Sequence, residues 1–284
     1  MKRPTFTLRC RDRELELGRR TAVMGVLNVT PDSFSDGGLY FEPSRAVDRA
    51  LEMVEEGADV IDVGGESTRP GADPVPLEEE LRRVVPVIEA IASRVPVPVS
   101  VDTYKAKVAK EALEAGASIV NDISGLQFDP RMAEVVARYG AAVVVMHIKG
   151  TPKTMQQDPR YDDLMGEITQ YLEDGVRRAE EAGVSPDAIV VDPGIGFGKR
   201  LEHNLTIFSR LEELSSLGKP VLIGPSRKRF IGEILGVEVG ERLFGTLASV
   251  AAAVMRGAHI VRVHDVRPVR QVVDVVDAIL GVEA

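Results

Sequence analysis

The chain has no tryptophan and a single cysteine among its 284 residues, and only 5% of them are aromatic. One cysteine, Cys10, excludes an internal disulfide framework and is typical of a reducing compartment, so we expect a cytoplasmic protein in which this thiol is an inert residue of a hairpin. No apolar run reaches the length needed to cross a membrane, and positions 1–4 lack the apolar segment of a signal peptide.

Basic side chains are fewer than acidic ones. With 35 Lys and Arg against 44 Asp and Glu, the formal net charge is −9, which argues against broad binding to nucleic acids or anionic membranes. A small anionic substrate remains compatible with this charge if basic side chains converge locally. The length suits either one large α/β barrel or two ordinary domains.

A repeating unit decides between these two. A helix ends in glycine, a small residue follows, and a short β-branched run ends in polar groups. The unit recurs at 57–62, 116–122, 140–147 and 257–262. Glycine is favoured just past a helix, and near-continuous apolar strands are expected when both faces of a sheet are covered. This repetition predicts a parallel sheet.

The fold that accommodates about eight such units is a TIM (β/α)8 barrel, in one domain spanning 1–284. Residues 1–18 form an N-terminal β-hairpin turning at Arg11-Asp12 and covering one end of the barrel, which occupies 19–284. The predicted strands are 22–27, 60–63, 97–101, 119–122, 142–147, 189–191, 221–224 and 260–263. A doubly wound open sheet is the alternative, but the chain lacks a G-x-G-x-x-G turn after its first strand and a Walker lysine motif.

Amphipathic segments between these strands predict the helices. They are 45–56, 78–92, 105–115, 131–139, 162–182, 201–217, 243–255 and 269–280. We expect Ser44 to cap the first, Pro86 to kink the second and Asp129-Pro130 to open the fourth. The segment 243–255 is apolar nearly all round, which indicates either burial or a subunit contact.

Polar side chains follow nearly every predicted strand. They are Asn28, Asp62, Asp102, Asn121, Asp122, His147, Asp192, Ser226, Arg227, Lys228, Arg262 and His264. Any one of them could be a cap or part of a buried ion pair. Burying unpaired charge at all the strand ends would be costly, so their gathering on one barrel face favours an enzyme.

These groups divide into two kinds of chemistry. Asp102, Asn121, Asp192 and Lys228 suit a flat heterocycle that has both hydrogen-bond donors and acceptors. One neutral oxygen and two cationic donors suit a phosphate with its metal, and Asn28, Arg262 and His264 supply them. The polar, glycine-flanked loops 28–38 and 64–71 are candidate lids, and a glycine-rich loop follows Asp192. No second histidine lies at ligand spacing from His147, so we expect a hydrogen-bonded structural histidine there.

With these motifs in view, the chain resembles the dihydropteroate synthases, the folate-pathway enzymes that sulfonamides target. The matching segments, in order, are 24–38, 64–71, 101–103, 121–123, 146–147, 192–199, 224–228 and 262–266. The resemblance implies a transferase that joins 6-hydroxymethyl-7,8-dihydropterin diphosphate to 4-aminobenzoate and releases diphosphate. It also implies Mg²⁺ as cofactor and a homodimer.

The same resemblance assigns residues to each ligand. The pterin would be held by Asp102, Asn121, Ile123, Met146, Asp192, Phe197, Gly224, Lys228 and Arg262, and the 4-aminobenzoate by Thr68, Arg69, Pro70, Phe197, Ser226 and Lys228. The diphosphate would be held by Asn28, Thr68, Arg262 and His264, with Asn28 as a metal ligand. The implied catalytic residues are Asp102, Lys228, Arg262, Asp32 and Phe34, the last two on the closing loop beside Asp36.

No paired nucleophile and base occurs among the strand-end residues, so we expect an SN1-like order in which diphosphate departs before the amine attacks. Two other functions use similar barrels. A methyltetrahydrofolate-dependent corrinoid methyltransferase would share the Asp and Asn positions but has no use for Ser226-Arg227-Lys228 or Thr68-Arg69-Pro70. A non-catalytic pterin-binding barrel predicts decay of the two lid loops, and both are intact here.

Overall fold

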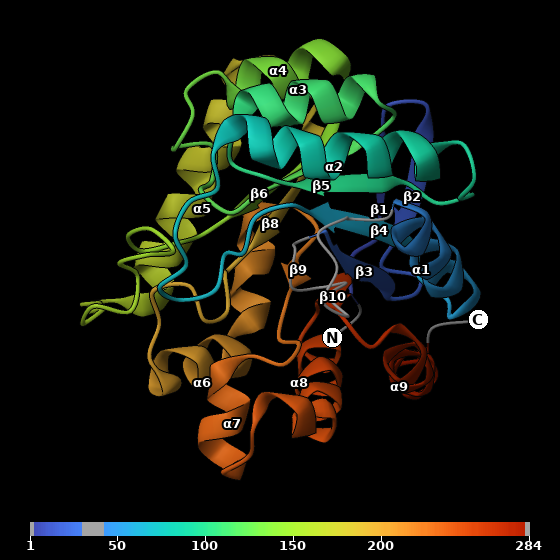
Figure 1. The fold of residues 1–284 in the computed structure, drawn as a ribbon. Coiled ribbons are helices and arrows are strands. Elements are labelled where there is room, and N and C mark those ends of the chain that lie inside the picture. The colour runs from blue at the N-terminus through green and yellow to red at the C-terminus, as the bar shows by residue number, and fades with distance from the viewer. Residues whose placement is uncertain (1–2, 30–42, 282–284) are drawn as a thin grey trace.

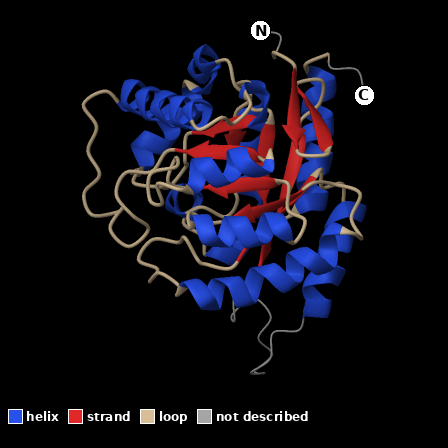
Figure 2. Cartoon of the chain, turned by 90° about the horizontal axis from the view of Figure 1, so that it is seen from above, coloured by secondary structure: helices blue, strands red, loops and turns tan. Residues whose placement is uncertain are grey.

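The computed structural model describes residues 3–29 and 43–281, and in these ranges a parallel sheet is wrapped by helices (Figures 1 and 2). The neighbouring strands in order are β8-β7-β6-β5-β4-β3-β10-β9. An isolated parallel bridge between Val191 and Val221 joins the two ends of this order, and the Val191 N–H donates to the Pro220 carbonyl oxygen at 3.0 Å. The sheet is therefore a barrel and the alternative of an open, doubly wound sheet is wrong.

The strands are short, as expected for a barrel whose strands are covered on both sides. Their bounds are β3 (Ala22–Asn28), β4 (Val60–Gly64), β5 (Val99–Asp102), β6 (Ile119–Asp122), β7 (Ala142–Met146), β8 (Ile189–Asp192), β9 (Leu222–Ile223) and β10 (Ile260–Val263). The helices are α1 (Pro43–Glu55), α2 (Leu77–Ala92), α3 (Ala106–Glu114), α4 (Met132–Tyr139), α5 (Leu164–Glu181), α6 (Leu201–Ser209), α7 (Arg229–Leu235), α8 (Leu243–Met255) and α9 (Val266–Ile279). Over the ranges described, none of the helices combines the length and apolarity needed to span a bilayer.

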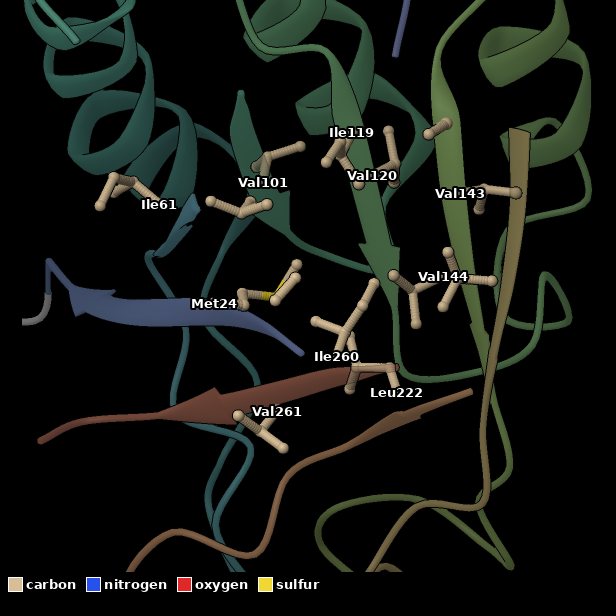
Figure 3. Packing of buried hydrophobic residues seen from close by; sticks show 14 of the residues in the cluster. Met24, Ile61, Val101, Ile119, Val120, Val143, Val144, Leu222, Ile260 and Val261 are labelled. Carbon is tan, nitrogen blue, oxygen red and sulfur yellow. The ribbon is translucent and has the colours of Figure 1, made fainter. Parts of the chain in front are cut away.

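The strand register fixes which side chains face the barrel interior. Asn28 pairs with Gly64, Gly64 with Asp102, and Asp102 with Asn121. Side chains alternate along a strand, so the residues two positions earlier share this face. Towards the amino ends the interior is filled by apolar side chains, and Figure 3 shows Met24, Ile260 and Leu222 close together within the ring of strands. The interior thus changes from apolar to polar towards the carboxyl ends, where the site lies.

An antiparallel hairpin, β1 (Phe6–Cys10) and β2 (Arg13–Leu17), precedes the barrel as predicted. At its turn, the Arg11 guanidinium donates to the carbonyl oxygens of Leu113 and Ala117, at 2.7 and 2.9 Å, in the segment that leads into β6. The hairpin therefore closes the amino end of the barrel. Cys10 is buried in the core, and burial raises the pKa of its thiol to about 12, as expected for an inert residue.

Several helix boundaries differ from the predicted ones. Ser44 lies inside α1 instead of capping it. The Asp129 carboxylate accepts from the Arg131 N–H at 3.1 Å, as expected of a residue that opens a helix, although α4 itself begins only after Arg131. Its other oxygen accepts from the Ala106 N–H at 3.0 Å, at the start of α3. Pro86 lies within α2, which continues on both sides of it.

The predicted helix 201–217 is also interrupted. At Arg210 the backbone leaves the helical region, and α6 is followed by a 3-10 helix (Leu211–Leu217). Helix α7 was not predicted. The strand predicted at 221–224 is reduced to β9, because only Leu222 and Ile223 pair continuously with β10 and Val221 forms the isolated bridge to Val191. Two further short 3-10 helices lie at Pro186–Ala188 and Val239–Glu241.

Candidate functional site

The carboxyl ends of the strands open into a cavity of about 1440 Å³. Eleven of the predicted site residues line it: Asn28, Thr68, Arg69, Pro70, Asp102, Phe197, Gly224, Ser226, Lys228, Arg262 and His264. They come from widely separated positions in the sequence, and only the closure of the barrel brings them to one rim. The structure therefore brings these eleven side chains to one cavity.

Four other predicted residues lie beneath or beside this cavity: Asn121, Ile123, Met146 and Asp192. All four are buried, and Ile123 and Met146 belong to an apolar cluster with Ile148, Met155 and Phe197. This cluster forms a compact apolar wall separate from the main core, of the kind that holds the faces of a flat ligand. Asp32, Phe34 and Asp36 lie outside the described residues.

The Arg262 guanidinium joins two carboxylates from neighbouring strands. Its Nε donates to Asp62 Oδ2 and its Nη2 to Asp102 Oδ2, both at 2.6 Å. The same Asp62 oxygen accepts from Asn121 Nδ2 at 3.1 Å, which ties the amide of β6 to the fork. This planar, two-pronged geometry is one that a lysine could not reproduce.

The ionised groups at this fork interact strongly with one another because Asp62 and Asp102 are buried. Burial disfavours the Arg262 charge, but Asp62 and Asp102 more than compensate, so the pKa of Arg262 lies above its ordinary value. Burial raises the pKa of the Asp102 carboxyl, helped by the charges of Asp62 and Glu80 and opposed by Arg262. The second oxygen of Asp62, Oδ1, is buried without a hydrogen-bond partner in the described part of the chain.

Asp192 is held by the glycine-rich loop that follows it. Its Oδ1 accepts from the Gly194 N–H at 2.7 Å, and Gly194 has φ +68°. A Cβ on Gly194 would lie 2.0 Å from the His147 carbonyl oxygen, so only glycine allows this close approach of the β7 and β8 ends. Burial raises the pKa of Asp192 to about 6, against the Gly194 hydrogen bond and the charge of Lys228.

Lys228 and Phe197 meet at the other side of the same loop. The Lys228 Nζ lies 4.1 Å from the centroid of the Phe197 ring, a cation–π distance. Burial of the ammonium and the charge of Arg262 lower the pKa of Lys228 to about 8, while Asp192 and Asp102 oppose this shift. Lys228 is therefore charged but easily deprotonated, which suits a group that donates to a bound ligand.

His264 corrects one expectation. Its Nδ1 is 3.0 Å from Ser226 Oγ, and burial together with the charge of Arg262 lowers the pKa of His264 to about 3. The imidazole is therefore neutral near pH 7 and is not the cationic donor that the sequence suggested. Positive charge near His264 comes from Arg262, Arg227 and Lys228 instead.

His147 is the hydrogen-bonded structural histidine that was expected. It is buried, and its Nδ1 lies 2.8 Å from the Nζ of Lys199, which also donates to the Phe197 carbonyl oxygen at 2.9 Å. Burial, followed by the Lys199 charge, lowers the pKa of His147 well below its ordinary value. The pair links the end of β7 to the loop after β8 and supports both Asp192 and Phe197 from below.

Sequence reasoning placed Asp62 on the rim but gave it no role, and it missed Lys199, Glu66 and Lys105. Alternation along β6 should have separated Asn121 from Asp122, because adjacent strand residues face opposite sides. Asp122 indeed turns away from the site, and its Oδ1 accepts from the backbone N–H and hydroxyl of Ser124 at 2.7 and 2.6 Å. The pairing of Glu66 with Lys105 had no signal in the sequence.

Comparison with known proteins gives one consistent answer. The profile of the family described as pterin binding enzyme matches residues 24–264. Among curated relatives, dihydropteroate synthase from Synechocystis sp. is 50% identical over 263 residues, covering 92% of this chain and 91% of the relative. The dihydropteroate synthase of Escherichia coli K12 is 50% identical over 259 residues, covering 91% of this chain and 92% of the relative.

Solved structures agree. Dihydropteroate synthase of Yersinia pestis in a sulfonamide drug complex superposes with a TM-score of 0.91 at 45% identity, covering 98% of this chain and all of that one. The Xanthomonas albilineans enzyme with 4-aminobenzoic acid has a TM-score of 0.91 at 43% identity, covering 99% of this chain and all of that one. The Thermus thermophilus enzyme in complex with 4-aminobenzoate has a TM-score of 0.84 at 49% identity, covering 96% of this chain and 99% of that one.

Proposed function

Because this chain belongs to the pterin-binding enzymes, and among them to the dihydropteroate synthases, we propose that the residues at its barrel rim join a dihydropterin diphosphate to 4-aminobenzoate and release diphosphate. The observation that carries the assignment of residues is the convergence of buried acids, a guanidinium and an ammonium on one cavity. A solved relative that contains 4-aminobenzoic acid supports the amine substrate.

In this proposal the pterin occupies the deepest part of the cavity. Asp102, Asn121 and Asp192 present carboxylate and amide groups at the strand ends, where a flat heterocycle offers matching donors and acceptors. Ile123, Met146, Phe197 and Gly224 enclose its faces, and Arg262 and Lys228 approach from the rim. Positive charge that develops on the pterin methylene spreads into the ring, where Asp102 and Asp192 stabilise it in a site of low dielectric.

The aminobenzoate occupies the outer part of the cavity. Thr68, Arg69 and Pro70 form one side, while Phe197, Ser226 and Lys228 form the other. Lys228 offers a cation to the carboxylate, and the Phe197 ring offers an apolar face to the benzene ring. An aromatic amine is a weak base that needs little deprotonation before it attacks, so no strong general base is required.

The diphosphate would be received by Asn28, Thr68, Arg262 and neutral His264 at the rim. Mg²⁺ fits this set because it binds few protein ligands, retains waters and coordinates substrate phosphates, and Asn28 supplies a neutral oxygen. In the part of the chain that the structure describes, no group of three His, Cys, Asp or Glu side chains could hold a metal without substrate. The ion would neutralise the charge of the departing diphosphate.

Departure before attack is the order we propose. The cavity gathers groups that stabilise separated charge, with acids beneath the ring and cations at the rim. Rapid-quench sampling should detect diphosphate before an equivalent amount of amine is consumed. Isotope effects that show bond making and bond breaking in a single step would overturn the order without affecting the overall reaction.

The test of the function is a diphosphate-release assay with pterin diphosphate, 4-aminobenzoate and Mg²⁺, each omitted in turn, with chromatography of the dihydropteroate product. We expect release in proportion to product, and an Asp192→Ala variant with a loss of at least ~100-fold in kcat/KM. Pterin binding without turnover would favour the non-catalytic barrel. Methyl transfer from methyltetrahydrofolate to a corrinoid would favour the methyltransferase.

We further propose a homodimer formed through α7, α8 and α9, which adjoin one another in the fold (Figure 1). Large apolar side chains are exposed on this surface: Ile234, Leu235, Phe244, Met255, Val275 and Ile279. Large apolar side chains exposed on adjoining helices favour a protein contact there. We keep the cytoplasm as the proposed location, supported by the single, reduced cysteine. The acidic net charge leaves small molecules as the expected partners beside a second copy of the chain.

A further inference from the structure

The loop 67–74 carries Thr68, Arg69 and Pro70 and leaves the barrel between β4 and α2. Its two ends are joined directly, because the Val75 N–H donates to Glu66 Oε2 at 3.1 Å. Glu66 is buried although it is charged and lies at the base of a polar loop. A buried carboxylate at the foot of a substrate-binding loop needs a compensating partner.

That partner is Lys105, from the connection between β5 and α3. Its ammonium donates to Glu66 and to Glu80 and forms a third hydrogen bond, 2.8 Å long, to the Val75 carbonyl oxygen. All three donors of the ammonium are thereby used. The Glu80 side chain is only 1% exposed, so this is a buried charge cluster, unlike the exposed ion pairs elsewhere on the helices.

We propose that Lys105 is a positioning residue that clamps both ends of the loop 67–74 to the barrel and thereby sets the affinity for the aromatic amine. Without the ammonium, Glu66 and Glu80 would be two carboxylates left in one buried pocket. Glu80 lies within α2, whereas Glu66 directly precedes the loop and is part of no helix or strand. Without the ammonium, Glu66 is therefore the carboxylate that can move into water. Because the loop is attached to Glu66, this movement opens the loop.

Two further contacts of the loop with described residues hold it less strongly. At its tip the Gly71 N–H donates to the Pro152 carbonyl oxygen at 3.0 Å, and Lys153 pairs with Asp73 in an exposed bridge. Exposed ion pairs contribute little to stability. The clamp at the base is therefore the contact that keeps the loop closed.

The clamp also connects the two substrate positions. Lys105 follows Asp102 by three residues, and the Tyr104 hydroxyl between them donates to Glu66 Oε1 at 2.5 Å. The Tyr104 ring packs against the apolar cluster that includes Met146 and Phe197. The segment that carries the pterin-binding acid thus also holds the amine-binding loop.

This inference rests on the proposed assignment of the loop to 4-aminobenzoate, and its test has a readout that needs no substrate. In hydrogen exchange of the ligand-free protein, the hydrogen-bonded amides of Gly71, Ala72 and Val75 should exchange at least ~10-fold faster in Lys105→Met, with unchanged protection in the barrel strands. Lys107→Met is the matched control, because Lys107 is an exposed lysine of α3 that pairs only with Glu111 among the residues the structure describes. It should exchange like the unmodified protein.

The kinetic readout follows from the same shift in loop population. If the closed loop falls to about one tenth of molecules, KM for 4-aminobenzoate rises ~10-fold, while kcat and KM for the pterin diphosphate stay within about 2-fold. Lys105→Arg should restore part of the affinity because it keeps the charge. If Lys105→Met does not fold, Tyr104→Phe removes one hydrogen bond to Glu66 and should give a smaller change in the same direction.

Unchanged exchange at the amides of Gly71, Ala72 and Val75 in Lys105→Met, or in Tyr104→Phe if that variant has to be used, would overturn the clamp, whatever substrate the enzyme uses. Faster exchange throughout the chain would also overturn it, since that would show only lost stability. Faster exchange confined to the loop, with no effect on KM for 4-aminobenzoate, would retain the clamp and overturn its role in amine binding. Failure of the proposed function itself would appear separately, as absence of diphosphate release by the unmodified protein.

Discussion

Replacing Arg262 by methionine tests the charge balance at the barrel rim most sharply. The change keeps an unbranched side chain of similar length but removes the guanidinium shared by Asp62 and Asp102. The Asp62 side chain has no exposed surface and that of Asp102 is only 9% exposed, so the variant keeps two nearby buried carboxylates that have lost the guanidinium they share. Removing one partner of such a buried arrangement costs about 3–5 kcal/mol.

We expect the lower end of that range, because the cavity gives water access to the Arg262 side chain. With an unfolding entropy of about 2.1 cal/mol/K per residue, a loss of ~3 kcal/mol corresponds to a fall in Tm of roughly 5 °C for a chain of 284 residues. The deficit depends on pH. When the pKa of a carboxyl is higher in the folded than in the unfolded state, ionisation of that carboxyl destabilises the folded protein. The destabilisation begins as the pH rises above the unfolded-state pKa and grows until the pH reaches the folded-state pKa.

The raised pKa of Asp102 places it in this class, and loss of Arg262 raises it further. The fall in Tm should therefore be largest near pH 8 and should shrink towards pH 5. Scanning calorimetry at both pH values measures it, with Arg262→Lys as a variant that keeps the charge and loses the fork. Adding Asp62→Asn to Arg262→Met should recover part of the stability. An unchanged Tm at pH 8, or a deficit that grows on acidification, would refute the reasoning.

Four further outcomes are expected. Gly194→Ala should lower the free energy of unfolding by about 2–4 kcal/mol in urea titrations, since its Cβ would collide with a backbone carbonyl at a φ of +68°. Gly71→Ala, at a φ of +82° but with open space around the added Cβ, should lower it by only ~1 kcal/mol. Equal losses in the two variants would contradict this reasoning. Calorimetric affinity for 4-aminobenzoate should decline as the pH rises through about 8 and Lys228 loses its proton, and should be flat for Lys228→Met. Phe244→Asp should yield monomers in sedimentation velocity if the exposed side chain, at 80%, lies in the dimer contact. A thiol reagent should modify Cys10 only after unfolding, and rapid labelling of the native protein would be inconsistent with its burial.

Four of the eight strands could be located from the sequence because the same local pattern leads into each of these four. A glycine, a small residue and a β-branched run lead to Asn121 in the same way as they lead to Arg262. The alternation of side chains then places these residues on the interior face without any knowledge of the fold. The site is predictable to that extent.

What was missed depends on contacts between distant segments. The charge of His264 could not be read from its identity, since burial beside Arg262 keeps it neutral. The clamp of Lys105 on Glu66 joins residues 39 positions apart, with no motif at either end. Such pairings arise only when the barrel closes.

The most direct test of the account is a crystal structure of this protein with an unreactive pterin diphosphate analogue. The central claim is that one rim holds acids for the heterocycle beside donors for the polyphosphate. We predict the ring against Asp102, Asn121 and Asp192, and the diphosphate against Asn28 and Arg262. A ring bound away from these acids, or a diphosphate in a pocket that does not communicate with theirs, would contradict the claim.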